Sequence, residues 1–114
     1  MSKRTEEAFL FDILEASQRI RLYIEGMIYA DFLADLKTQD SVIRNIEIIG
    51  EAVKNISSKL RAEHNHIAWK AMAGMRDRLI HEYFGVNVDI VWGVATEDIP
   101  LLMQEVNKIL SAEK

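Results

Sequence analysis

The chain has 114 residues, of which 49% are hydrophobic and 28% charged, and its formal net charge is −4. This length and composition predict a single folded domain, residues 1–114, and argue against a protein coated with positive charge for loose nucleic-acid binding. The absence of cysteine excludes disulfides, thiolate zinc sites and a cysteine nucleophile. No stretch resembles a signal peptide or a membrane span, so we expect a cytoplasmic protein that does not contact a membrane.

Helical spacing of the apolar residues, with only five glycines and one proline, favours helices throughout. The predicted fold class is all-α, an up-and-down bundle of four to five helices. The first helix is expected from Glu6 to Ile24, with Thr5 as its N-cap, and a short helix from Ala30 to Leu36. A polar turn follows, in which Thr38 or Asp40 would cap the next helix.

The third helix, expected from Ser41 to Leu60, has the most regular apolar stripe. The stripe steps by four and three residues and comprises Val42, Ile46, Ile49, Val53, Ile56 and Leu60. Gly50 costs a helix interior about 1 kcal/mol relative to alanine, so we expect another helix to approach closely there. Glu51 is either paired with a cation or an ordinary exposed carboxylate. Ile43 and Ile48 lie off the stripe, which indicates a second neighbour or another subunit.

Residues 61–66 are expected to form a polar linker that contains His64 and His66. Two histidines at this spacing can contact a metal, but no carboxylate or thiolate cluster accompanies them. We therefore interpret both as solvated loop residues and expect no metal site.

Two further helical segments are predicted. One runs from Ile67 to Phe84, and Gly74 within it again suggests close approach of a neighbouring backbone. The other runs from Val88 to about Leu110, with Asn87 as its N-cap. Pro100 lacks a backbone N–H and must kink or split this last segment.

The densest polar cluster is the octet Arg76-Asp77-Arg78-Leu79-Ile80-His81-Glu82-Tyr83. Arg76 carries a permanent charge and a planar fork of donors that suits phosphate oxygens, and His81 titrates near neutrality. Asp77 and Arg78 precede His81 by four and three residues, so both lie within its reach on a helix. An arginine and a histidine suffice, without a metal, for cleavage of RNA by its own 2′-hydroxyl. A structural salt-bridged cluster would have the same sequence pattern.

The spacing within the octet bears on how such a site would be completed. Arg76 and His81 lie about 140° apart around an ideal helix, and Tyr83 points nearly opposite to His81. One helix therefore does not close a compact site. A second copy of the chain across a two-fold axis would supply the missing groups.

Several stretches resemble the HEPN superfamily of helical RNases, and in particular its HepT-like branch. The octet has the form of that superfamily's R-x4-H motif, as R-x4-H-x-Y. The segment Val42–Ala52 (VIRNIEIIGEA) resembles the "RN-x-E-x-x-GEA" helix of the branch, and Trp69–Asp77 (WKAMAGMRD) resembles its "GMRN" lead-in. The resemblance continues through Val91-Trp92 and Ile99-Pro100-Leu101 and covers nearly the whole chain.

This resemblance implies a toxin of a type VII toxin–antitoxin system. Such toxins are metal-independent endoribonucleases that act as homodimers, with both R-x4-H motifs facing one cleft. Their partner is MntA, a minimal nucleotidyltransferase antitoxin that silences them by transferring AMP to the motif tyrosine. Carried over here, Arg76 and His81 would be catalytic, Asp77 and Arg78 would support them, and Tyr83 would be the AMPylated residue. The substrate would be RNA, such as tRNA or mRNA, and no cofactor is expected.

Two features leave other interpretations open. Asp77 stands where the family more often has asparagine, and an acid there costs phosphate attraction unless His81 or an arginine neutralises it. With an acidic chain, attraction for RNA must come from local cations, for which the candidates are Arg44, Lys70, Arg76 and Arg78. The alternatives are a non-catalytic helical module that binds a nucleotide or a nucleotidyltransferase, and a purely structural dimer.

Overall fold

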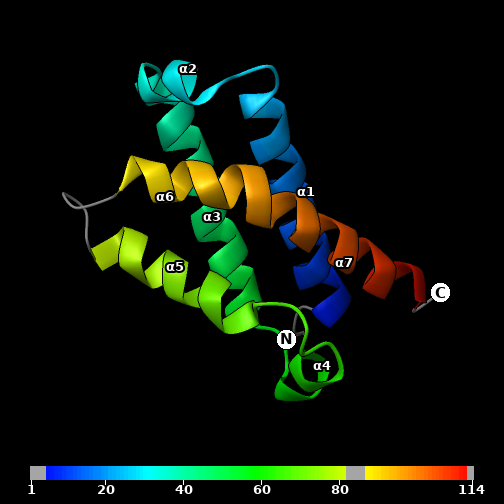
Figure 1. Ribbon diagram of the computed structural model, residues 1–114. Coiled ribbons are helices and arrows are strands. Elements are labelled where there is room, and N and C mark those ends of the chain that lie inside the picture. Colours follow the sequence, from blue (N-terminus) through cyan, green and yellow to red (C-terminus); the bar gives the residue numbers. More distant parts are fainter. Residues whose placement is uncertain (1–4, 82–86, 113–114) are drawn as a thin grey trace.

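The computed structural model describes residues 5–81 and 87–112, with side chains for all of these except residues 77–81. This part of the chain folds into seven α-helices and one π-helical turn, without a strand (Figure 1). The predicted all-α helical bundle is therefore confirmed. Within the same residues, no helix combines the length and the apolar character that crossing a membrane requires.

Helices α1 (Glu6–Ile24) and α3 (Leu36–Lys54) lie side by side and form the centre of the bundle (Figure 1). The bounds of α1 are those predicted. Its buried residues recur at helical spacing and are Leu10, Ile13, Ala16, Ser17 and Ile20. Gly26 has a φ of +77°, a left-handed conformation that glycine adopts without strain, and it turns the chain toward α2 (Tyr29–Leu33).

Two predicted N-caps, at Thr5 and Asn87, are confirmed. The Thr5 hydroxyl oxygen accepts a hydrogen bond of 3.1 Å from the N–H of Ala8 at the start of α1. The Asn87 side-chain oxygen accepts from the N–H groups of Asp89 and Ile90 at 2.9 and 3.3 Å. Each bond satisfies a donor that the first turn of a helix would otherwise leave unpaired.

The predicted cap of the third helix is wrong. Asp35, rather than Thr38 or Asp40, caps α3, and the helix begins at Leu36 instead of Ser41. The Asp35 carboxylate accepts hydrogen bonds from the backbone N–H and the hydroxyl of Thr38, at 3.0 and 2.8 Å. These bonds favour the charged carboxylate and lower the pKa of Asp35.

The early start of α3 places Gln39 inside the helix, where it joins α3 to α2. Gln39 is buried, and its side-chain amide donates to the carbonyl oxygens of Phe32 and Leu33 at 2.9 and 3.0 Å. The last turn of α2 leaves carbonyls without helical partners. Gln39 donates to two carbonyls of this turn, of which that of Phe32 also accepts from the N–H of Asp35 at 3.2 Å, and it thereby ties α3 to α2.

The end of α3 also differs from the prediction. The helix stops at Lys54, and Ser57 caps a separate helix α4 (Ser58–Glu63) by accepting from the N–H of Leu60 at 3.1 Å. The predicted polar linker is therefore partly helical. All six stripe residues are nevertheless buried, including the two that lie beyond the end of α3: Val42, Ile46, Ile49, Val53, Ile56 and Leu60.

Pro100 follows a π-helical turn that divides the last segment. The segment consists of α6 (Val88–Gly93), the π turn η1 (Val94–Asp98) and α7 (Ile99–Ala112). Three buried residues follow one another at a spacing of four through this turn: Val91, Ala95 and Ile99. Two steps of four overshoot two α-helical turns by about 80°. The wider π turn absorbs this excess and keeps all three residues on the core side.

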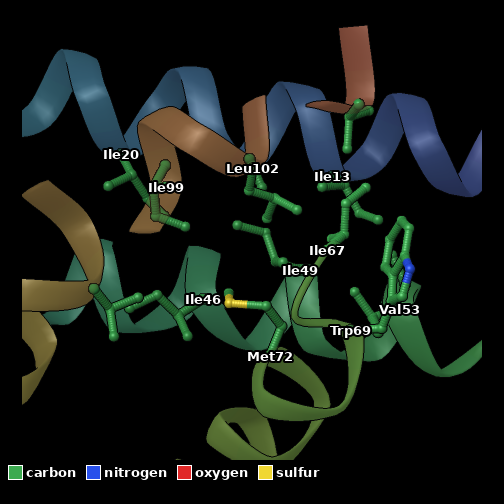
Figure 2. Packing of buried hydrophobic residues seen from close by; sticks show 14 of the residues in the cluster. Ile13, Ile20, Ile46, Ile49, Val53, Ile67, Trp69, Met72, Ile99 and Leu102 are labelled. Carbon is green, nitrogen blue, oxygen red and sulfur yellow. The ribbon is translucent and has the colours of Figure 1, made fainter. Parts of the chain in front are cut away.

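Helix α5 (Trp69–His81) packs mainly on α3. Among its residues 69–76, whose side chains the structure describes, Trp69 and Met72 are buried. Figure 2 shows Met72 beside Ile49 of α3, in a cluster that Ile13 of α1 also joins. The Trp69 indole N–H also donates to the carbonyl oxygen of His64 at 3.0 Å. The sequence predicted this helix from Ile67 to Phe84. It begins two residues later, and Phe84 and the predicted stop at Gly85 lie outside the described residues.

Candidate functional site

Arg76 lies on α5 at the side that faces α3, with its side chain 26% exposed. Its Nη2 atom lies 3.0 Å from Oε2 of Glu51 on α3, a side chain that is 58% exposed. The sequence left open whether Glu51 is paired or exposed, and it is both. Because α5 continues through His81, Arg76 and His81 belong to one unbroken helix.

Gly50 allows α5 to come this close to α3. A Cβ atom built on Gly50 would lie 2.1 Å from Cβ and 2.9 Å from Cγ of Arg76, and 3.1 Å from the carbonyl oxygen of Met72. Carbon atoms that are not bonded need about 3.5 Å, so only glycine fits without a shift of α5. The close approach predicted at Gly50 is confirmed, and the residue opposite is Arg76. The same prediction for Gly74 is wrong, since a Cβ there would meet no described atom of a neighbour within 4 Å.

A cavity of about 320 Å³ lies beside the Arg76–Glu51 pair. It is lined by α1, α3 and the arginine, with Phe9, Asp12, Arg44, Glu47, Ile48, Glu51, Ala52, Asn55 and Arg76. A second hollow adjoins it and shares Arg44 and Ile48. Two arginines thus face three carboxylates in the first cavity. The lining of this cavity is therefore mixed in charge, with Arg44 and Arg76 as its cations.

The other predicted site residues are described in part. Asp77, Arg78 and His81 lie in α5, but their side chains are not among those described, and Tyr83 lies outside the described residues. The predicted contact between Asp77 and His81 therefore stays a prediction.

The family is decided by comparison with known proteins. A family model described as "Ribonuclease HepT-like" matches residues 13–109. The chain belongs to the HepT-like family.

Named relatives agree with this assignment. The HepT-like chain is 47% identical over 107 residues to the "Probable ribonuclease HepT" of Thermococcus cleftensis, which covers 94% of this chain and 97% of that one. It is 42% identical over 110 residues to a "Putative RNase" of Methanocaldococcus jannaschii, covering 96% and 91% of the two chains. It is 41% identical over 111 residues to a "Putative RNase" of Caldanaerobacter subterraneus subsp. tengcongensis, covering 97% and 99%. No solved structure matches the chain significantly.

Two of the segments that resemble HepT-like proteins are neighbours in the fold. Val42–Ala52 belongs to α3 and Trp69–Asp77 to α5. They meet where Arg76 lies over Gly50 and pairs with Glu51. Each segment can be recognised in the sequence by itself, whereas the contact between them depends on the packing of α5 on α3.

The histidines of the predicted linker have structural partners in the HepT-like fold. Nε2 of His66 lies 2.7 Å from Oε2 of Glu105 on α7, and the backbone carbonyl of His64 accepts the Trp69 indole N–H. The hydrogen bond from His66, together with one from Lys108, lowers the pKa of the Glu105 carboxyl. Within residues 5–81 and 87–112, apart from the side chains of residues 77–81, no three histidine or carboxylate groups converge as metal ligands.

Proposed function

We propose that this HepT-like chain is the toxin of a type VII toxin–antitoxin system, a metal-independent endoribonuclease that acts as a homodimer. Membership of a family described as ribonuclease HepT-like supports cleavage of RNA. The observation that carries the assignment of the site is Arg76, held by Glu51 beside a cavity and on the same unbroken helix as His81.

The proposed reaction uses the nucleophile that RNA itself carries. His81 takes the proton of a 2′-hydroxyl, and the oxygen attacks the adjacent phosphorus. Arg76 donates hydrogen bonds to the non-bridging oxygens, where charge builds up in the transition state. A separate general acid protonates the leaving 5′-oxygen. The products are a 2′,3′-cyclic phosphate end and a 5′-hydroxyl end, and Asp77 and Arg78 support the two principal residues.

A second copy of the chain is part of this proposal. Residues five apart on a helix point about 140° away from each other, so one α5 cannot direct both Arg76 and His81 at one phosphate. In a homodimer whose α5 helices face a common cleft, the arginine of one copy and the histidine of the other converge. The second copy also supplies the acid that the leaving group requires.

Silencing is proposed to act through Tyr83. An MntA-type nucleotidyltransferase would join the tyrosine oxygen to the α-phosphorus of ATP, and pyrophosphate would leave. The product carries an additional negative charge two residues from His81. The negative charge of the added AMP repels the RNA phosphate, and the AMP group itself occupies space beside the motif.

The cleavage test uses the purified protein and a single-stranded RNA. We expect cleavage that persists in EDTA, leaves a cyclic phosphate, and spares a DNA of the same sequence. Arg76→Ala and His81→Ala should each abolish it, while Arg21→Ala, which removes the same charge from the surface of α1, should not. RNA cleavage that persists in both motif variants refutes the assigned site, and an inactive wild-type chain that still binds a nucleotide favours the non-catalytic module.

The silencing test uses an MntA-type enzyme with ATP and mass spectrometry of the intact chain. We expect the mass of one AMP to be added, and cleavage to be lost with it. Tyr83→Phe should resist both changes, whereas Tyr23→Phe, which alters an exposed tyrosine on α1, should behave as wild type. Equal modification of Tyr83→Phe would exclude the tyrosine as the acceptor.

A further inference from the structure

We propose that Glu51 is the positioning residue for Arg76 and a counter-ion that competes with an RNA phosphate for it. This inference rests on the proposed function, because it assigns a task to a residue beside the arginine of that site. It extends the site from α5 to α3. Glu51 itself touches no reacting atom in this account.

Two consecutive residues of α3 hold the two ends of the Arg76 side chain. At Gly50 the missing Cβ leaves room for Cβ and Cγ of Arg76, which fixes where the side chain begins. At Glu51 the carboxylate binds Nη2 at 3.0 Å, which fixes where the guanidinium ends. An arginine side chain has many rotamers, and ordering it costs free energy. Contacts at both ends remove much of that freedom before any ligand arrives.

The Arg76–Glu51 pair is exposed enough for another anion to compete with Glu51 for Arg76. Glu51 is 58% exposed and Arg76 26% exposed, so water and ligands reach the carboxylate side. Ion pairs in such surroundings contribute little net stability. Two oxygens of a phosphate group offer a guanidinium a similar pair of acceptors, and they can accept two parallel hydrogen bonds. The Glu51 carboxylate contacts Nη2, so a phosphate competes with it for the guanidinium and can bind other N–H donors while Glu51 still limits the rotamers of Arg76.

The surrounding charges explain why the counter-ion matters. The adjacent cavity contains Arg44 as its second cation, and Asp12 and Glu47 as further carboxylates. With Glu51 included, negative groups outnumber positive ones in the lining. Removal of the Glu51 charge makes the lining neutral. Phosphate binding should strengthen as a result, while the guanidinium loses the group that orients it.

Loss of the Glu51 charge should strengthen binding of RNA, whereas loss of the group that orients Arg76 should slow turnover. Three variants separate these two effects. Glu51→Gln removes the charge but keeps an oxygen acceptor of the same shape. Glu51→Ala removes both. Glu47→Gln is the matched control, because it removes the same charge from the same cavity one helical turn away.

Binding is measured with a 2′-O-methyl RNA, which cannot be cleaved. Both Glu51 variants should bind it up to about fivefold more tightly than wild type, the range that an exposed ion pair allows. Glu47→Gln should change the affinity by less than either. In an Arg76→Ala background the gain should vanish, since the arginine through which Glu51 acts is absent. A gain that persists there overturns the proposal.

Turnover is measured with the corresponding cleavable RNA. Glu51→Gln should keep kcat within about twofold, whereas Glu51→Ala should lose about tenfold in kcat while KM falls, because a loosely held guanidinium is misplaced for the reaction. A merely structural role for Glu51 would lower kcat in proportion to the folded fraction and leave KM unchanged. That result would overturn the inference.

A third measurement does not depend on RNA, so it separates this inference from the proposed function. Phenylglyoxal modifies accessible guanidinium groups, and peptide mass mapping gives the rate at Arg76. The rate should rise several-fold in Glu51→Gln and Glu51→Ala and stay unchanged in Glu47→Gln. Rates equal to wild type in both Glu51 variants would show that the carboxylate does not hold Arg76. If the wild-type chain does not cleave RNA but the Glu51 variants still show a raised rate of Arg76 modification, the ribonuclease proposal is rejected and the role of Glu51 stands.

Discussion

Replacing Gly50 with alanine is the most direct perturbation of the contact between α3 and α5. The new methyl group would lie 2.1 Å from Cβ of Arg76 and 3.1 Å from the carbonyl oxygen of Met72. The start of the arginine side chain and a backbone oxygen cannot rotate away. The helices must therefore separate, by more than about 1 Å, to reach an ordinary carbon–carbon contact of about 3.5 Å.

The magnitude follows from two opposing terms. Alanine gains about 1 kcal/mol of intrinsic helix stability over glycine. Overpacking of a close contact costs about 1–3 kcal/mol, and the upper end applies here because both obstacles are rigid. The net loss is about 2 kcal/mol, which lowers Tm by about 8 °C in a domain of this size. Arg76 moves with α5, and a misplacement of about 1 Å costs up to about 100-fold in a catalysed rate.

Thermal unfolding followed by circular dichroism, together with the RNA cleavage assay, measures both effects. Gly93→Ala and Gly74→Ala are the matched controls, because a Cβ at either position meets no described neighbouring atom within 4 Å. Both should keep or raise Tm. If Gly50→Ala melts at or above the wild-type temperature and cleaves RNA at the wild-type rate, the close approach of α5 to α3 at Gly50 contributes neither to stability nor to cleavage, and the prediction is refuted.

Two further predictions concern the junction of α2 and α3. Asp35→Ala should lower Tm by removing the cap, whereas Asp35→Asn should retain a cap that does not titrate. Because hydrogen bonds from Thr38 lower the pKa of Asp35, its contribution is present above the unfolded pKa of about 4 and is lost as pH falls through the folded value. Wild type should therefore lose more stability than Asp35→Asn between pH 6 and 2.5 in urea titrations, and parallel losses would contradict this. Gln39→Leu should cost about 1–3 kcal/mol in urea unfolding, since the Leu33 carbonyl loses the Gln39 amide as donor and the Phe32 carbonyl is left with the N–H of Asp35. An unchanged midpoint would show that the amide contributes nothing to stability.

Helix positions follow from the sequence better than helix ends do. The apolar stripe located α1 and α3, because burial of one face determines which residues are apolar. The sequence suggested Thr38 or Asp40 as the cap of α3, whereas the cap is Asp35, which precedes both. Asp35 prevails because the helix that it starts also carries Gln39 to the end of α2. The break after Lys54 was missed because Ile56 and Leu60 remain buried beyond it, so the stripe continues while the helix does not.

The candidate site was only partly predictable for a related reason. The octet can be recognised in the sequence because Arg76 and His81 are only five residues apart, within one helix. Gly50 and Gly74 look alike in the sequence, but among the described residues only a Cβ on Gly50 would meet an atom of another helix within 4 Å. A glycine reveals that a side chain is missing but not what lies opposite. The pairing of Glu51 with Arg76 depends on how α5 crosses α3, which no local pattern encodes.

The mainly one-sided packing of α5 has a consequence for native-state hydrogen exchange. The helix rests chiefly on α3, through contacts to which the buried Trp69 and Met72 contribute. We expect its amides to exchange through a subglobal opening that leaves α1, α3 and α7 folded, at a free energy below that of global unfolding. That opening separates Arg76 from Gly50 and Glu51. The population of molecules with an assembled arginine is then set by the docking of one helix, and not by the stability of the whole chain.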